Sequence, residues 1–325
     1  MNRLITRNNR AVSRKEIPCI PIDEFRKEMI DAYHKHNRVI SFFGVPSPNA
    51  SSPKVLLIAV LADDENSMLF IYSTLLEKGS SYPSITKDAP PFHIFEREFY
   101  DEFGILPEGH PWLKPVRYDF RRADQSKALK DYPFFKMTGD ELHEVAVGPV
   151  HAGIIEPGHF RFMCSGELVH HLEIQLGFQH RGVESLFEKN AKSKANPFSI
   201  HLAESIAGDS VIAHATACAS AEEALRHHEI SLRAAVIRAI ALELERTAVH
   251  IGDLGAIAND IAYLTGNAVF GATRTLVINT SLALCGSRFG RGWIRSGGVK
   301  FDIDSSLQQK MKETLTKVKH DVELM

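Results

Sequence analysis

The sequence predicts an α+β fold in two parts: a small mixed domain, then a larger domain that begins with strands and continues as a helical bundle. Two observations support this prediction. Residues 21–113 combine helical spacing with short apolar runs, whereas residues from 199 onward repeat apolar side chains every three or four positions. Residues 121–147 are charged and lack a steady period, so they are predicted to link domains 1–120 and 148–325.

The N-terminal part opens with a helix and a sheet. Residues 21–36 carry apolar side chains at helical spacing, with acidic residues in the first turn. Three apolar runs follow, at residues 39–45, 55–61 and 68–72, separated by turn-forming residues. This order predicts an antiparallel sheet in which the last two runs form a hairpin.

A second helix is predicted within residues 90–113. Phe95, Phe99 and Phe103 lie four residues apart and would share one apolar face, and Gly104 would end the helix. The pattern by itself indicates a helix that covers a sheet and implies no chemistry.

The stretch from Gly148 to Glu188 is rich in ionisable side chains near turns. Gly148-Pro149 and Pro157-Gly158 predict turns, and the apolar runs at 160–163 and 172–178 predict strands. Ionisable residues at such turns suit proton transfer or an anionic ligand, although a solvated polar rim explains them equally. The residues concerned are His151, Glu156, His159, Arg161, His180, Arg181 and Glu184.

The C-terminal half is predicted to be helical. Helical patterns cover residues 199–229, 229–266, 272–285 and 305–323. The segment GSRFGRGWIRSGG at 286–298 is predicted to be a mobile, cationic loop.

Composition excludes several classes of function. The formal net charge is −2, which gives no reason to expect nucleic acid or an anionic membrane surface as partner. No run approaches about 18 apolar residues, so no transmembrane helix is expected. The basic N-terminus has no apolar stretch, which favours a cytoplasmic chain. No GxGxxG motif follows a predicted strand, so this chain is not itself expected to oxidise NADH.

Cysteine and histidine give contrasting signals. The four cysteines share no CxxC spacing, so no zinc or iron–sulfur site built from thiolates is expected. Ten of the 16 histidines fall between His143 and His228, which indicates either ordinary surface histidines or a polar cavity that moves protons. A metal or small-molecule site is a further alternative, built from His170, His171, His227 and His228. Against it, the side chains of neighbouring residues in a helix or strand point in different directions, so adjacent histidines cannot easily bind one metal ion.

Several motifs together resemble known families. GPVH at 148–151, EPGHFR at 156–161 and HRGVE at 180–184 resemble the large subunit of membrane-bound group 4 [NiFe]-hydrogenases, of the hydrogenase-3 and hydrogenase-4 types. They also resemble the homologous quinone-site protein of complex I, the NADH-quinone oxidoreductase, which is its D subunit. FYDEFGI at 99–105, followed by GHP, resembles the C subunit of complex I. The order matches the fused C and D subunits, which implies a C-like domain, then a hydrogenase-like domain that lacks the family's distal part.

The resemblance also identifies departures from the family. Ala207 and Ser210 stand where the hydrogenases carry nickel-binding cysteines, whereas His214 keeps its register with a family histidine. Gly208 replaces the quinone-binding tyrosine of complex I, and Pro157 replaces a histidine of its loop. Neither alanine nor serine is a good ligand for a soft metal, so this chain is expected to hold no [NiFe] centre.

The resemblance implies a peripheral-arm subunit of a complex I-like or hydrogenase-4-like oxidoreductase. Electrons would arrive from a [4Fe-4S] cluster in an iron–sulfur small subunit, quinone is a possible acceptor, and no cofactor is expected to be held firmly by this chain. Antiporter-like membrane subunits would hold it at the cytoplasmic face of the inner membrane. Glu156 would transfer protons, and the cavity would be lined by His151, His159, Arg161, His180, Arg181 and His214. The alternative is a non-catalytic scaffold or assembly subunit that keeps the fold without the chemistry.

Overall fold

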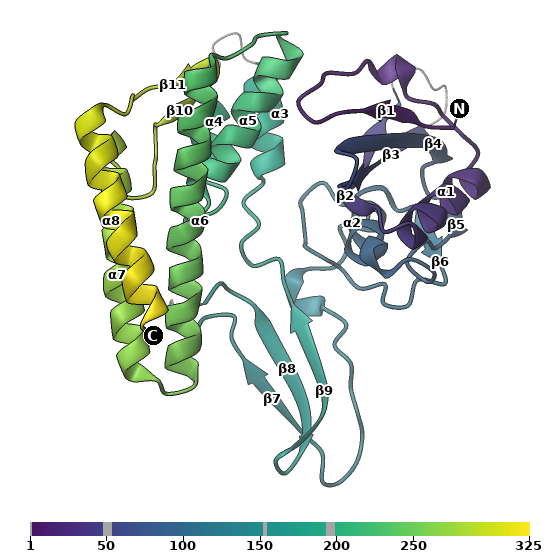
Figure 1. Cartoon of the computed structure of the whole chain (residues 1–325). Helices are drawn as coiled ribbons and strands as arrows, with labels where there is room; N and C mark the ends of the chain where they lie inside the picture. Colours follow the sequence, from purple (N-terminus) through teal and green to yellow (C-terminus); the bar gives the residue numbers. More distant parts are fainter. Residues whose placement is uncertain (1, 48–53, 152–154, 193–198) are drawn as a thin grey trace. The chain divides into compact units, whose positions relative to one another are not determined.

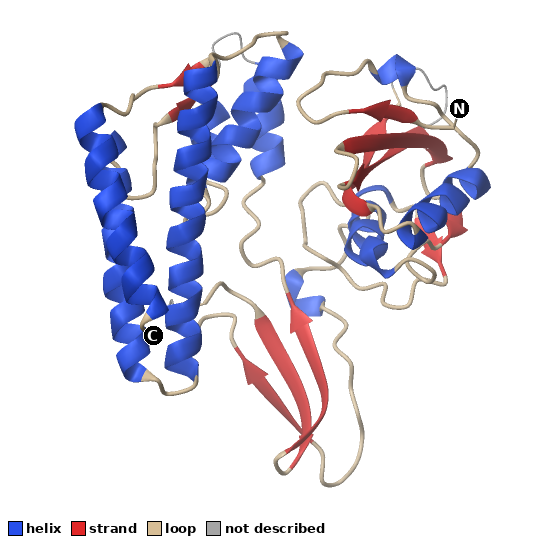
Figure 2. Cartoon of the chain, viewed as in Figure 1, coloured by secondary structure: helices blue, strands red, loops and turns tan. Residues whose placement is uncertain are grey.

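The computed structural model describes residues 2–47, 54–151, 155–192 and 199–325. The chain divides into two compact units, the first containing residues 1–8 and 12–182 and the second residues 9–11 and 183–325. Strands dominate the described part of the first unit and helices that of the second, as Figure 2 shows, so the predicted α+β class is confirmed. The compact units divide near residue 182. The predicted sequence domains 1–120 and 148–325 are a different division of the chain and stay a prediction.

The N-terminal sheet forms as predicted. Its strand order is β1-β4-β3-β2 and every pairing is antiparallel, with β3 and β4 joined as the expected hairpin. Helices α1 and α2 lie in the same region (Figure 1). The elements are β1 (Leu4–Thr6), α1 (Ile22–His34), β2 (Arg38–Pro46), β3 (Lys54–Asp63), β4 (Met68–Glu77), β5 (Ser81–Pro83), α2 (His93–Phe103) and β6 (Leu106–Glu108).

Aromatic side chains fix α2 onto the sheet. Phe42 of β2 meets Phe92 and Phe99 edge to face, with ring centroids 5.6 and 6.0 Å apart. Gly44 of β2 lets the helix approach, because a Cβ atom there would lie 2.4 Å from the Phe103 ring. The predicted apolar face is therefore the packing face, and the opposite face of α2 is left for polar contacts.

A second, three-stranded sheet follows. Its strands are β7 (His143–Val147), β8 (His159–Ser165) and β9 (Leu168–Gln175), paired antiparallel in that order. Both predicted strands are present, although the second begins and ends earlier than residues 172–178. The polar stretch of the sequence analysis thus forms β8, β9 and the turns around them.

The second unit is a helical bundle (Figure 1). Helices α6 and α7 make its main pair, and α8 packs on α7. The elements are α3 (Val183–Lys192), α4 (Ser199–Glu204), α5 (Val211–Leu225), α6 (Leu232–Asp260), α7 (Leu264–Cys285), β10 (Ile294–Arg295), β11 (Gly298–Val299) and α8 (Ser305–Glu323).

Several predicted helix boundaries were wrong, including the end of the helix predicted at 229–266, which ends at Asp260. Residues 199–229 form not one helix but α4 and α5, separated by a turn at 205–210. Glu245 of α6 explains the restart, because its carboxylate accepts hydrogen bonds from the first free N–H groups of α5, those of Ile212 and Ala213, at 2.6 and 3.0 Å. Helix α7 also begins at Leu264, eight residues earlier than predicted.

The loop after α7 was predicted to be mobile, but it is held by buried carboxylates. The Gly292 N–H donates to Glu204 and the Gly297 N–H donates to Glu223, each at 2.7 Å. Arg238 pairs with Glu223 and also donates to the Gly298 carbonyl oxygen. The loop is therefore a fixed structure on which Arg288, Arg291 and Arg295 are exposed.

Helix α7 is long and apolar enough to cross a membrane by length and composition alone, which the sequence analysis did not expect. One such helix is weak evidence, because the core helices of globular proteins pass the same test. Phe270, Val277, Ile278 and Leu284 of α7 belong to the buried core of the bundle. This packing is what a core helix requires.

Candidate functional site

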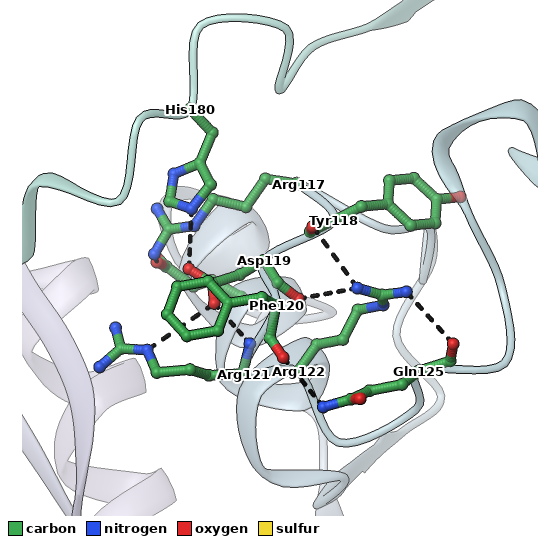
Figure 3. A network of polar contacts seen from close by, with 9 residues as sticks. Arg117, Tyr118, Asp119, Phe120, Arg121, Arg122, Gln125 and His180 are labelled. Carbon is green, nitrogen blue, oxygen red and sulfur yellow. Dashed lines mark hydrogen bonds and ion pairs between the residues drawn. The ribbon is translucent and has the colours of Figure 1, made fainter. Parts of the chain in front are cut away.

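The HRG motif meets the segment after α2. The ring of His180 lies 2.7 Å, Nε2 to Oδ2, from the carboxylate of Asp119, and Figure 3 shows the two side chains pointing toward each other. Their side chains are only 20% and 13% exposed. Gly177, three residues before His180, lets the backbone lie close to Val116. Its φ is +93°, and a Cβ atom there would lie 3.0 Å from the Val116 carbonyl oxygen.

Polar residues of α2 hold the segment that carries Asp119. The carboxylate of Asp101 accepts from the Val116 N–H at 2.8 Å. Arg97 donates to the carbonyl oxygens of Lys114 and Pro115, at 2.7 and 3.1 Å. These contacts hold residues just before the predicted linker 121–147, and the linker itself ends in β7 (His143–Val147).

A tight turn sets the position of Asp119 itself. Its Oδ1 atom accepts from the Arg121 backbone N–H at 2.7 Å, and its carbonyl oxygen accepts from the Arg122 guanidinium at 2.8 Å. Gln125 donates to the Phe120 carbonyl oxygen at 2.9 Å, closing the turn (Figure 3). The main chain of Asp119 and its Oδ1 atom are therefore held by the turn, and Oδ2 is the atom that contacts His180.

The two aspartates of this region have opposite electrostatic environments. Burial raises the pKa of Asp101 to about 6, because the N–H groups that it binds only partly offset desolvation. Burial also acts to raise the pKa of Asp119, but hydrogen bonds from Arg121 and His180 outweigh it and leave that pKa below its usual value. Asp119 is thus a stable anion beside a histidine, whereas Asp101 titrates near neutrality.

Glu173 of β9 binds the chain on both sides of Asp119, at Lys114 and at Phe135. Its buried carboxylate accepts from the Lys114 ammonium at 2.6 Å and from the Phe135 N–H at 2.7 Å. Burial, followed by the charge of Glu173, raises the pKa of Tyr132 to about 12. The second sheet is therefore tied to the same segment that presents Asp119.

His151 and His159 brace the two predicted turns. The His151 ring donates from Nε2 to the Gly158 carbonyl oxygen at 2.7 Å, and the His159 ring donates from Nδ1 to the Gly148 carbonyl oxygen at 3.0 Å. Each histidine thus uses one nitrogen to hold the opposite turn. Their predicted role in lining a cavity stays a prediction.

The remaining predicted residues are dispersed. Arg161 of β8 pairs with Glu144 of β7 and covers the Phe134 ring, 4.4 Å from its centroid. Glu156 is exposed, so in this chain burial does not desolvate its carboxylate as the predicted proton role assumed. Arg181 is also exposed, and His214 lies half-buried on α5 in the second unit. The roles of these residues stay predictions.

The nickel position was tested against the residues present. Ala207 and Ser210 lie in the turn between α4 and α5, where alanine offers no ligand atom and serine only a hydroxyl. Within the described ranges, no three His, Cys, Asp or Glu side chains converge as metal ligands would. These residues do not fit a [NiFe] centre with thiolate ligands.

Sequence reasoning missed Asp119, Asp101 and Glu173. Asp101 lies inside the FYDEFGI motif, where the helical pattern drew attention to the phenylalanines alone. Asp119 is surrounded by arginines in the stretch RYDFRR, a local charge pattern that could have suggested a structured turn. No local signal links Asp119 to His180, because the two are 61 residues apart.

The chain resembles components of energy-converting complexes. Residues 24–134 match the family described as the 30 kDa subunit of respiratory-chain NADH dehydrogenase. Hydrogenase-4 component G of Escherichia coli is 28% identical, with 88% of this chain and 54% of that protein covered. Formate hydrogenlyase subunit 5 of Escherichia coli is 31% identical, over 68% of this chain and 42% of that protein.

Two further likenesses extend the comparison. The C/D subunit of NADH-quinone oxidoreductase from Nitrosospira multiformis is 24% identical over 79% of this chain and 46% of that protein. The membrane-bound sulfane sulfur reductase, an archaeal respiratory membrane complex, contains a chain with the same fold at a TM-score of 0.50 and 22% identity, covering 56% of this chain and 48% of that one. The present chain spans about half the length of the curated relatives that it matches.

Proposed function

Because this chain is a relative of the group 4 hydrogenase large subunits and of the fused C and D subunits of complex I, we propose that it is a peripheral-arm subunit of a membrane-bound oxidoreductase of that kind. The observation that carries the proposal is the joining of two motif sets in one chain, through contacts between them. Asp101 of the FYDEFGI motif binds the Val116 N–H, and Asp119, three residues after Val116, contacts His180 of the HRGVE motif.

The redox centres would belong to partners. Ala207 and Ser210 offer no thiolate, so this chain would not build its own [NiFe] centre. Electrons would come from a [4Fe-4S] cluster in an iron–sulfur small subunit, and the acceptor would be a quinone or a similar carbonyl compound. Antiporter-like membrane subunits would hold the chain at the cytoplasmic face of the inner membrane.

The fixed cationic loop is the surface that we assign to the iron–sulfur partner. Arg288, Arg291 and Arg295 are exposed on it, and Glu204 and Glu223 hold its backbone from within the bundle. A preorganised loop binds a partner at lower entropic cost than a mobile one. Its positive charge would favour an acidic surface on the partner.

The protein's own contribution would be proton delivery and orientation of the acceptor. His180 is the best-supported residue for this role, because the carboxylate of Asp119 orients its ring. Glu156, His151, His159, Arg161, Arg181 and His214 complete the proposed set.

The redox role is tested by single substitutions in the assembled complex. His180→Ala and Glu156→Gln are each expected to lower donor-dependent acceptor reduction in membranes by about a hundredfold or more, the size expected for loss of a general acid. Exposed His320→Ala on α8 is the matched control and is expected to retain activity. The amount of assembled complex is measured alongside by native gel electrophoresis.

A scaffold role is the second candidate, favoured by Ala207, Ser210 and the exposure of Glu156. It predicts a different pattern in the same experiment. Deleting the chain would abolish assembly, whereas His180→Ala and Glu156→Gln would leave the activity per assembled complex unchanged. That result would remove this chain from the chemistry while keeping it in the complex.

A further inference from the structure

The contact between Asp119 and His180 determines which ring nitrogen carries the proton. His180 Nε2 faces the carboxylate Oδ2 at 2.7 Å, and an ionised carboxylate can only accept a hydrogen bond. The environment of Asp119 keeps its pKa below the usual value, so it is ionised at neutral pH. Nε2 must therefore carry a hydrogen, and Nδ1 is the nitrogen that gains and loses a proton.

We propose that Asp119 is a positioning residue for His180: it fixes the ring as the Nε2–H tautomer and directs Nδ1 to proton exchange with the acceptor. This proposal rests on the proposed function, because it names the residue that orients the proposed proton donor. It assigns a role to Asp119, which the sequence analysis did not single out.

The surroundings of Asp119 are built for this task. Its Oδ1 atom is occupied by the Arg121 N–H at 2.7 Å, so Oδ2 is the oxygen left for His180. Arg122 fixes the main chain of the turn through the Asp119 carbonyl oxygen, at 2.8 Å (Figure 3). The carboxylate cannot exchange its two oxygens without breaking these contacts.

The support extends back to α2. Asp101 binds the Val116 N–H, and Arg117 of the same segment pairs with Glu98 of α2 at 2.5 Å. Arg117, Arg121 and Arg122 line the same small cavity as Asp119, together with Glu98, Asp101 and Glu102 of α2. Asp119 lies within the region that matches the 30 kDa subunit family, whereas His180 lies outside it. A residue of one sequence region thus orients a residue of the other.

The proposed step is a simple proton transfer. Nδ1 takes a proton from water, and the ring becomes an imidazolium that still contacts the Asp119 carboxylate through Nε2–H. A quinone-type carbonyl acceptor would take up two electrons and two protons; with each electron that the partner subunit supplied, the Nδ1–H bond would break and that proton would bond to an acceptor oxygen. The ring returns to the neutral Nε2–H form, so charge and protons balance in each cycle.

Asp119→Asn gives a sharp test. The asparagine oxygen is expected to keep the Arg121 N–H, which places the amide NH₂ where Oδ2 lies now. A donor at that position requires an unprotonated Nε2, so the neutral ring is expected to switch to the Nδ1–H tautomer. The ¹⁵N chemical shifts of the His180 ring in the full chain report the tautomer directly, independently of any activity.

Asp124→Asn is the matched control. Asp124 lies in the same segment and its carboxylate binds Ser126 rather than a histidine, so the tautomer of His180 is expected to stay unchanged. In the assembled complex, Asp119→Asn is expected to lower acceptor reduction by about ten- to hundredfold, as loss of an orienting partner does. Asp124→Asn is expected to stay within about twofold of the natural chain, the scatter expected of an exposed surface change.

The outcomes separate the two proposals. An unchanged tautomer in a folded Asp119→Asn chain would overturn the positioning role, whatever the activity. A switched tautomer with full activity would also overturn it, and would leave the proposed function standing. If Asp119→Asn fails to fold, Asp119→Ala is used, and it must give a mixture of tautomers where the natural chain gives one. An assembled complex whose activity survives His180→Ala would instead contradict the proposed redox role of His180.

Discussion

At the scale of single residues, the chemistry of this chain depends on where its carboxylates are buried. Glu96 of α2 is fully buried and accepts four hydrogen bonds from Ser84, Ile85 and Thr86, which bind the helix to the preceding loop. Asp101, one turn further along, binds the segment that carries Asp119. The same helix therefore has a structural carboxylate and one that supports the candidate site.

The raised pKa of Asp101 leads us to expect that the stability of the first unit depends on pH. Its pKa is raised from 3.8 to about 6 in the folded chain, so the folded state binds more protons than the unfolded state between these values. The free energy of unfolding of the first unit is therefore expected to fall as pH rises from about 4 to about 6, by up to about 3 kcal/mol from this group.

Urea titrations followed by Trp112 fluorescence measure this dependence, because Trp112 lies in the first unit. Asp101→Asn should flatten the decline, since the amide oxygen can still accept from Val116 and no charge is desolvated. Asp140→Asn, at an exposed position, should keep it. Equal slopes for Asp101→Asn and the natural chain would show that Asp101 does not titrate in this range.

The sequence could indicate which residues belong to the candidate site, but not which side chains contact each other there. The sequence singled out His180 correctly as a residue near a turn, and the structure gives it a carboxylate. Which carboxylate could not be predicted, because the contact joins residues 61 positions apart through an irregular segment. Glu156 illustrates the opposite case, since the sequence cannot tell whether a charged residue at a turn is buried.

At the scale of elements, periodicity predicted most helices and strands. The hairpin of β3 and β4, the phenylalanine face of α2 and the bounds of α8 follow directly from local spacing. The errors occurred where tertiary contacts override local pattern. The break between α4 and α5 depends on Glu245, more than 30 residues later in the chain.

The buried ion pair of the second unit makes the next prediction. Arg238 and Glu223 are 4% and 8% exposed, and together they hold the loop between α7 and α8. Arg238→Met is expected to lower the free energy of unfolding by about 3–5 kcal/mol, because it leaves the Glu223 charge buried without its partner. Trp293, buried in the same unit, reports the transition by its fluorescence.

An exposed pair supplies the control for this experiment. Arg246 and Glu243 of α6 also form an ion pair, but both side chains are more than half exposed. Arg246→Met is therefore expected to change stability by less than about 1 kcal/mol. Similar losses for the two variants would mean that the Arg238 pair does not hold the loop as described.

At the scale of the whole molecule, the chain joins a C-like and a hydrogenase-like sequence region in one polypeptide. The resemblance could be recognised from short motifs, because several specific motifs occurred in the same order as in the fused relatives. Sequence could not locate the compact units, which divide near residue 182, because the second sheet is tied to the first unit by Glu173 and Lys114.

The most direct test of the central claim is purification of the tagged chain from its native membranes, with protein identification and iron and nickel analysis of what is recovered. We expect an iron–sulfur subunit and membrane subunits in the eluate, with iron present and without stoichiometric nickel. Charge reversal of Arg288, Arg291 and Arg295 should lower recovery of the iron–sulfur subunit. Recovery of the chain alone would contradict the proposed subunit role, and nickel bound to this chain would contradict the interpretation of Ala207 and Ser210.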